Sequence, residues 1–120
     1  MTAWIVEFAD EFEPEFERLP LVVQDELLAQ ALVIGRFGPH MGRPRVDTLH
    51  GSRHAAMKEL RFEAGGGVWR VAFAFDHRRR AVLLACGNKS GTSQRRFYRS
   101  LIALADARFD AHRARHPRRK

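Results

Sequence analysis

The chain has 120 residues, of which 45% are hydrophobic and 10% aromatic, a size and composition that favour one globular domain over two. A single cysteine excludes an internal disulfide and any cysteine-rich zinc site. The formal net charge of +7 is typical of proteins that bind nucleic acid, although anionic lipid would attract the same charge.

The charge is divided unevenly along the chain. Residues 1–30 hold one base, Arg18, and eight acids, for a net charge of −7, whereas residues 31–120 hold 20 bases and 6 acids, for a net charge of +14. The basic part is therefore the part expected to meet nucleic acid. The first residues have no basic region, and no stretch of about 18 apolar residues occurs anywhere, so we expect a cytoplasmic protein without a membrane partner.

One strand and a helical hairpin are predicted at the start. Residues 3–8 are short, rich in strand formers and bounded by acids, which predicts a strand. Residues 10–18 predict a first helix, in which Pro14 is tolerated only in the first turn. Residues 21–37 are rich in helix formers and predict a second helix that ends before Pro39. The stripe of the second helix that we expect to be buried is Val23, Leu27, Ala31 and Ile34.

Residues 57–76 predict a β-hairpin. After its turn, large and small residues alternate, so one face is a core face and the other is small and charged. If the turn 64–67 closes the hairpin, Arg61 lies directly opposite Arg70 on the small face. Like charges in that position destabilise two strands unless a carboxylate such as Glu59 lies beside them, whereas a phosphate could bind between the two guanidinium groups. The pair therefore predicts a phosphate-rich partner.

Loops and a last helix surround this hairpin. Residues 38–55 are rich in glycine, proline and bases and predict a long structured loop, a common place for function. Residues 80–87 predict the third strand of a meander, in which Cys86 is a buried hydrophobe rather than a nucleophile. Residues 93–112 predict a helix, and residues 113–120 a basic, disordered tail. The stripe of this helix that we expect to be buried is Phe97, Leu101, Leu104, Ala105 and Phe109.

The order strand, helix, helix, three-strand meander, helix predicts an α+β fold. We expect a single domain over residues 1–112, built on a mostly antiparallel four-stranded sheet. Two helices would cover one face of this sheet. The other face, which carries the small and charged residues, would be basic and partly open.

Four segments in this order carry a family resemblance: GRPRVDTLHGSRHAAMKELRF, GGVWRVAFAFD, LLACGNKSG and QRRFYRSLIALADARFDAH. With them the chain resembles the RelE/ParE toxin superfamily, and more closely its phage-derived HigB-like branch. The resemblance implies the RelE-like fold and the toxin of a type II toxin–antitoxin system. Such a toxin is an mRNA endonuclease that acts on the ribosome, and its partner is a helix-turn-helix antitoxin (HigA-like).

The resemblance also implies the chemistry and the residues that perform it. The ribose 2′-hydroxyl attacks the adjacent phosphate without a metal, which requires a base, cations that stabilise the developing charge, and an acid. Arg61 and Arg70 match the charge-stabilising positions of the family. Further catalytic candidates are Lys58 and Lys89, as phosphate clamps or proton-transfer groups, and His54 as general base. Candidate RNA-binding residues are Arg43, Arg53, Arg96 and Tyr98, and Tyr98 could instead donate a proton or simply pack.

We assign no metal and no cofactor, because the other histidines show no spacing that suggests ligands and no phosphate-binding glycine motif occurs. Two other functions stay open. One is a ParE-like poison of DNA gyrase with the same fold, which would bind rather than cleave. The other is a nontoxic basic module that binds nucleic acid in a salt-sensitive way without cleavage.

Overall fold

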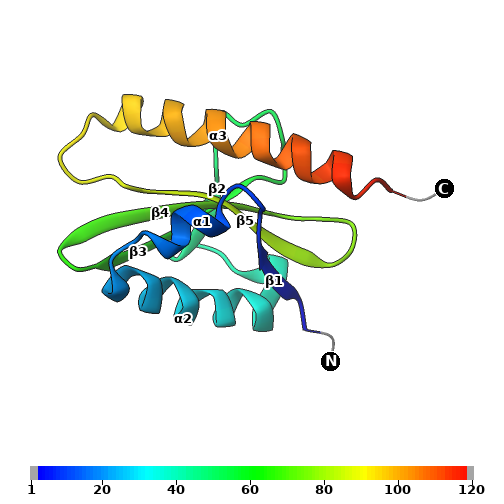
Figure 1. The fold of residues 1–120 in the computed structure, drawn as a ribbon, viewed down its shortest axis with the longest axis horizontal. Coiled ribbons are helices and arrows are strands. Elements are labelled where there is room, and N and C mark those ends of the chain that lie inside the picture. The colour runs from blue at the N-terminus through cyan, green and yellow to red at the C-terminus, as the bar shows by residue number, and fades with distance from the viewer. Residues whose placement is uncertain (1–2, 119–120) are drawn as a thin grey trace.

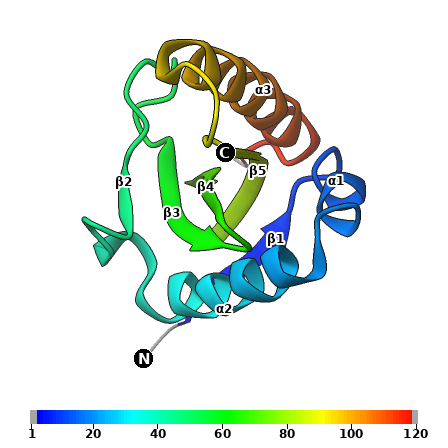
Figure 2. The same ribbon diagram turned by 90° about the vertical axis from the view of Figure 1, so that its left-hand side faces the viewer.

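One mixed sheet with helices on both faces forms the molecule, in a computed structural model that describes residues 3–118 (Figures 1 and 2). The elements in chain order are β1 (Ile5–Phe8), α1 (Glu13–Glu17), α2 (Leu21–Phe37), the 3-10 turn η1 (Gly38–His40), β2 (Val46–Thr48), β3 (Lys58–Ala64), β4 (Gly67–Phe75), β5 (Arg80–Asn88) and α3 (Gln94–Arg115). Over these residues no helix is both long and apolar enough to span a bilayer.

The sheet has five strands in the order β1-β5-β4-β3-β2, so the predicted number of four was wrong. The missed strand, β2, has only three residues and lies inside the segment that its glycines and prolines marked as a loop. Its register pairs Val46 with Leu60 in an antiparallel arrangement. Strand β1 is parallel to β5, and the other pairs are antiparallel. The α+β class and the mostly antiparallel sheet are confirmed.

The β3–β4 hairpin has the predicted register. Glu63 pairs with Val68, and Arg61 pairs with Arg70. The turn contains Gly65 and Gly66, both with positive φ, a conformation that side chains other than glycine rarely adopt. The alternation of side chains and the length of the turn were therefore sufficient to place the two arginines against each other.

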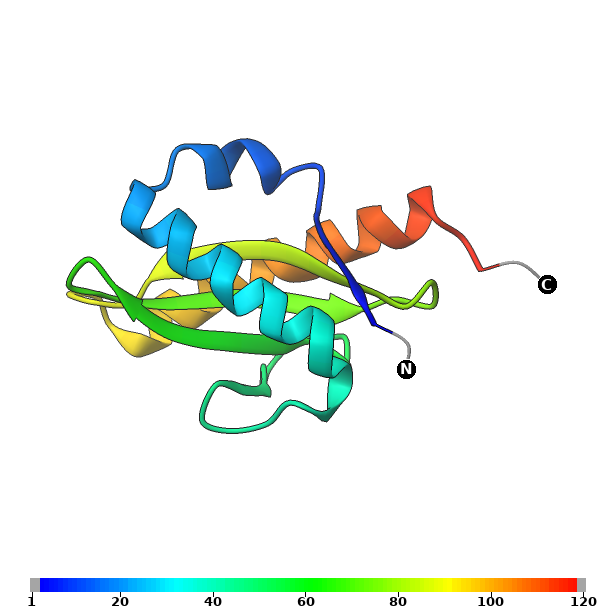
Figure 3. The ribbon, with the colours of Figure 1, turned by 90° about the horizontal axis from the view of Figure 1, so that it is seen from below.

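Helices α2 and α3 lie on opposite faces of the sheet (Figures 2 and 3). Val23, Leu27 and Ile34 of α2 are buried against one face, as predicted. The other face was expected to be partly open, but α3 covers most of it, because Ala72, Ala74 and Ala85 are small enough for a helix to pack on them closely. The openness that we expected is restricted to the end of this face where the two arginines lie.

Two helices differ from their predicted limits. Helix α1 is a single short turn, with Pro14 in its first turn as required. Helix α3 continues to Arg115, so residues 113–115 of the predicted disordered tail are helical. Residues 119–120 of that tail lie outside the described part of the chain. Within α3, Leu101, Ala105 and Phe109 are buried as expected, whereas Leu104 is 45% exposed.

Candidate functional site

A cluster of charged side chains lies where the β3–β4 hairpin passes under the first turns of α3. The carboxylate of Glu59 is buried, and its Oε1 lies 3.4 Å from the Nε atoms of both Arg61 and Arg70. This oxygen accepts a hydrogen bond from Arg61 and forms an ion pair with Arg70, and the two guanidinium groups face each other across the ladder. Because two positive charges share one negative charge, the cluster keeps an excess of positive charge.

Tyr98 closes this cluster from α3. Its hydroxyl donates to Glu59 Oε1 at 2.7 Å and accepts from Arg70 Nε at 3.2 Å. Burial and the hydrogen bond to Glu59 raise the pKa of Tyr98, so the phenol is protonated at neutral pH. Tyr98 is thus fixed as a proton donor rather than as an exposed stacking platform.

Arg61 is the more accessible of the two arginines, with 32% of its side chain exposed against 12% for Arg70. Burial opposes its charge, but the hydrogen bond and the charge of Glu59 outweigh burial and raise the pKa of Arg61. A second carboxylate, Asp47 of β2, lies 3.6 Å from the Arg61 Nη2. Asp47 also pairs with Arg43 at 3.7 Å, so the candidate RNA-binding residue Arg43, 76% exposed, lies at the rim of the cluster.

A pocket of about 370 Å³ opens beside the cluster. Its lining consists of Leu49, His50, Glu59, Arg61, Arg70, Lys89, Gln94 and Tyr98. Gln94 begins α3, so the positive end of the helix dipole lies at the pocket as well. A second hollow of about 560 Å³ shares Arg61 and Arg70 with the first and also includes Arg45. The two guanidinium groups therefore lie between two depressions large enough for nucleotide units.

The structure separates the candidate lysines. Lys89 lines the pocket with the two arginines, and its role as a phosphate clamp stays a prediction. Lys58 shares the strand parity of Leu60 and Phe62, so its side chain starts on the opposite face of β3 from Glu59 and Arg61. Lys58 is therefore not part of the cluster. Arg96, in the first turn of α3, is exposed.

His54 and Arg53 lie at the other end of α3. His54 Nε2 lies 2.8 Å from Asp110 Oδ1, and Arg53 Nη2 donates to Asp110 Oδ2 at 2.6 Å. The position of Asp110 is twelve residues beyond that of Tyr98, about 18 Å along the helix. His54 therefore cannot share a substrate phosphate with Arg61, and its predicted role as general base does not fit the structure.

We expect His54→Ala to retain full activity. The variant loses the contact with Asp110 and the packing on Phe109, so the free energy of unfolding should fall by about 1 kcal/mol. Activity and urea denaturation of the variant, measured beside the original protein, test both statements. A loss of activity at an unchanged folded fraction would return His54 to the list of catalytic candidates.

Sequence reasoning missed the central place of Glu59. It was considered only as a residue that relieves the repulsion between two arginines, whereas in the structure it accepts three hydrogen-bond or ion-pair contacts. A signal was present, because Glu59 and Arg61 share strand parity and so share a face. The contribution of Tyr98 had no comparable signal, since it depends on how α3 crosses the sheet.

A second charged cluster joins β1, the β4–β5 turn and the end of α3. Arg78 Nη2 lies 2.9 Å from Glu7 Oε1 and 3.0 Å from Asp76 Oδ2, and His112 Nε2 lies 2.9 Å from Asp76 Oδ2. The Arg78 guanidinium group pairs with both carboxylates, and Arg80, whose Nη1 lies 3.4 Å from Glu7 Oε2, supplies the second positive charge that balances them. We interpret this cluster as the structural link that holds the last turns of α3, and it explains why the helix extends beyond the predicted end.

The stability of this link should depend on pH through Asp76. Burial favours the neutral acid, but hydrogen bonds from His112, Arg80 and Arg78 outweigh burial and lower the pKa of Asp76. A lowered pKa contributes stability above the unfolded value near 3.9, and this stability is lost as the pH falls through the folded value. Asp76→Asn should therefore cost about 1–3 kcal/mol near pH 7, and the difference should shrink below about pH 4. Denaturant titrations at both pH values provide the measurement.

Cys86 has no role in either cluster. Burial raises the pKa of its thiol to about 12, which agrees with the prediction of an inert hydrophobe.

Comparisons with known proteins give a consistent picture. The family described as "Phage derived protein Gp49-like (DUF891)" matches residues 14–110. Two curated relatives from Mycobacterium tuberculosis (strain ATCC 25618 / H37Rv) are named as candidate toxins, HigB2 and HigB3. HigB2 is 45% identical over 91 residues, which cover 74% of this chain and 45% of the relative. HigB3 is 46% identical over 71 residues, which cover 59% of this chain and 60% of the relative. The chain thus spans about half the length of the curated relatives it matches.

A solved structure of a mutant of the E. coli toxin RelE in the free state superposes with a TM-score of 0.57. The match covers 85% of this chain and 96% of that chain, at 12% sequence identity. At this identity the likeness establishes a shared fold, and the predicted RelE-like architecture is confirmed.

Proposed function

Because the chain belongs to the phage-derived Gp49-like family and has the RelE fold, we propose that it is the toxin of a type II toxin–antitoxin pair, an endoribonuclease that cuts mRNA on the ribosome. Its partners would be the ribosome with its mRNA and a helix-turn-helix antitoxin of the HigA-like kind. The names of the two mycobacterial relatives support the toxin assignment. The proposal derives its chemistry from the cluster of Glu59, Arg61, Arg70 and Tyr98.

The observation that carries the proposal is the pair of opposed arginines that share a single buried carboxylate oxygen. Without a ligand, this arrangement leaves two guanidinium groups with fewer acceptors than they can use. A phosphate placed against them would receive forked, charge-assisted hydrogen bonds. Such donors stabilise a phosphorane most when its negative charge develops in a site that largely excludes water.

The cluster also contains groups for the two proton transfers. In the proposed reaction Glu59 takes the proton of the 2′-hydroxyl, the 2′-oxygen forms a bond to phosphorus, and the bond from phosphorus to the 5′-oxygen breaks. Tyr98 protonates the departing 5′-oxygen and regains a proton from Glu59 across their 2.7 Å hydrogen bond. Lys89 holds a phosphate oxygen at the pocket. The products are a 2′,3′-cyclic phosphate and a 5′-hydroxyl, and the protein returns to its starting state.

Chemically modified RNA tests this mechanism. A programmed ribosome that carries a message with a single 2′-deoxy nucleotide on the 5′ side of the cut should resist cleavage at that position, because the nucleophile is missing. The same message with the deoxy nucleotide three positions away serves as the control and should be cut. Cleavage at the deoxy position would contradict the transesterification mechanism.

The ParE-like reading makes a different prediction. A gyrase poison acts by binding, so its toxicity would not require the arginine pair, and DNA damage responses would rise on induction. A nontoxic binding module would bind RNA in a salt-sensitive way and leave it intact. The arginine cluster favours the nuclease, since neither alternative requires cations aligned around a buried proton acceptor.

A further inference from the structure

Helix α2 presents large apolar side chains to solvent, away from its buried stripe. Leu21 is 75% exposed, Leu32 is 77% exposed and Leu28 is 45% exposed. With Asp25, these positions follow the alternating spacing of four and three residues that aligns side chains along one helix face. Monomeric proteins rarely leave several large apolar side chains exposed together on one face, so this stripe, in which Asp25 lies between Leu21 and Leu28, marks an interaction surface.

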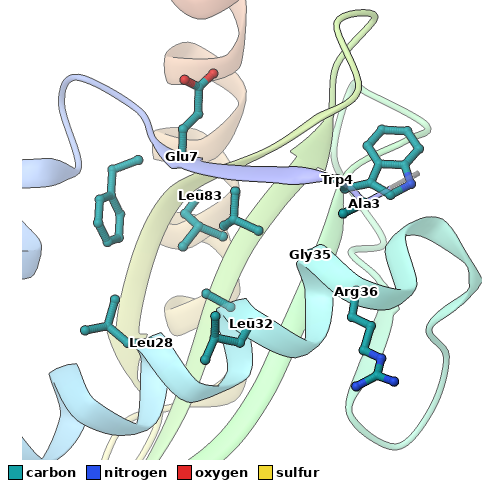
Figure 4. Close-up of a pocket in the computed structure, with 11 residues that line it drawn as sticks. Ala3, Trp4, Glu7, Leu28, Leu32, Gly35, Arg36 and Leu83 are labelled. Atoms are coloured by element: carbon teal, nitrogen blue, oxygen red, sulfur yellow. The ribbon is translucent and has the colours of Figure 1, made fainter. Parts of the chain in front are cut away.

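A groove of about 690 Å³ adjoins this stripe, between α2 and the edge strand β1 (Figure 4). Its apolar lining includes Trp4, which directly precedes β1, Val6 and Phe8 from β1, and Leu28, Ala31 and Leu32 from α2. In Figure 4 Leu28 and Leu32 border the groove, while the side chain of Arg36 points away from β1. The same face of the molecule therefore carries protruding leucines and a hollow that can receive them. Such a face can bind a second copy of itself around a twofold axis.

The charges along α2 agree with antiparallel self-pairing. In two antiparallel helices, the residue numbers of opposed positions have a constant sum. If opposed residue numbers add up to 60, Leu28 of each copy lies opposite Leu32 of the other copy, so the twofold axis produces this contact two times. In this register Asp25 lies opposite Gly35 and beside Arg36 of the second copy. Both Asp25 and Arg36 are exposed. Two symmetric ion pairs can therefore form at the ends of the leucine layer, each between Asp25 of one copy and Arg36 of the other.

The distribution of charge over the chain also favours this face. The net charge of +7 opposes self-association in general, but α2 itself carries only Asp25, Glu26 and Arg36, for a net charge of −1. Two copies that meet through α2 therefore meet at a nearly neutral part of the molecule. The arginine cluster belongs to β3 and β4 and stays outside this contact.

We infer that the α2 stripe and its groove form the interface of a symmetric, antiparallel homodimer. The occupant of each groove is the α2 stripe of the second copy, with Leu28 and Leu32 at its centre. This inference is independent of the proposed ribonuclease activity, because it uses none of the residues of the arginine cluster.

Analytical ultracentrifugation of the full chain over a range of concentrations tests the dimer. We expect a monomer–dimer equilibrium, and Leu32→Glu should weaken it at least about tenfold, because a charge would enter the apolar contact. Leu32 is mostly exposed in the single chain, so this change should not affect folding. The matched control is Leu104→Glu, an exposed leucine on α3 outside the stripe, which should leave the equilibrium unchanged.

Charge reversal tests the geometry. Asp25→Arg alone and Arg36→Asp alone should each weaken the dimer, since each sets like charges side by side. The double variant should restore the dimer, because the two ion pairs form again with reversed signs. A chain that is monomeric at all concentrations would overturn the inference. So would a dimer that resists Leu32→Glu or is not restored in the double variant. A monomer whose groove is filled by a helix of a different protein would overturn it as well.

Discussion

The double variant Arg61→Ala/Arg70→Ala is expected to lose toxicity and RNA cleavage while it keeps its fold. Both side chains surround the position where we place the phosphorane, and removal of one preorganised donor commonly costs on the order of 10²–10³ in rate. A loss of both should reduce cleavage below detection in a growth assay. The change removes the like-charge contact across β3 and β4, and Tyr98 remains as a hydrogen-bond donor to Glu59. It also leaves the buried Glu59 carboxylate without a cation, so stability should fall and activity is compared at matched folded fractions.

The loss of two positive charges needs its own control. Arg18→Ala/Arg113→Ala removes the same charge from two exposed positions outside the pocket and should retain cleavage. Cleavage of a purified, ribosome-bound message by the three proteins, at matched folded fractions from circular dichroism, gives the comparison. If the control and the arginine-pair variant lost cleavage equally, net charge rather than the cluster would be responsible.

The second large effect is expected for Glu59→Ala. This change leaves Arg61 and Arg70 opposed without their shared carboxylate and leaves the Tyr98 hydroxyl without its acceptor. Removal of one partner from a buried ionic group typically costs about 3–5 kcal/mol, and we expect about 3 kcal/mol because Arg61 is partly exposed. Thermal and urea denaturation measure the loss.

The same variant offers a direct test of anion binding. Inorganic phosphate should raise the melting temperature of Glu59→Ala more than that of the original protein, because an anion can replace the missing carboxylate between the guanidinium groups. Glu59→Gln separates packing from chemistry: the amide oxygen still accepts from Tyr98, so less stability should be lost than in Glu59→Ala, but the group cannot act as a base. Retained cleavage in Glu59→Gln would remove Glu59 from the proton path.

The hairpin shows how far the sequence could be interpreted. The alternation of large and small residues and the length of the turn determine the pairing of Arg61 with Arg70, because each further pair along a regular ladder follows from the first. Strand β2 was missed because three residues among glycines and prolines carry no recognisable alternation. The parallel pairing of β1 with β5 brings together segments that are distant in the sequence, so no local pattern announces it.

The site shows the same limit. His54 is seven positions from Arg61, and this proximity in the sequence suggested proximity in space. The intervening residues instead carry His54 to the far end of α3, where it pairs with Asp110. The alanines beside the arginines suggested an open floor, but small side chains also permit close packing of a helix, and α3 takes that place. Whether this face of the sheet is open or covered depends on where α3 lies. That position depends on contacts such as the one between His112 and Asp76.

The central claim is that the cluster of Arg61, Arg70, Glu59 and Tyr98 cleaves mRNA during translation. The most direct measurement is to induce the protein and its Arg61→Ala/Arg70→Ala variant in bacteria and to map new 5′ ends of messages, with translation running or blocked. We predict growth arrest with new 5′-hydroxyl ends that require translation and disappear in the variant. Growth arrest without new ends, or arrest that persists in the variant, would contradict this account and favour a gyrase-type poison.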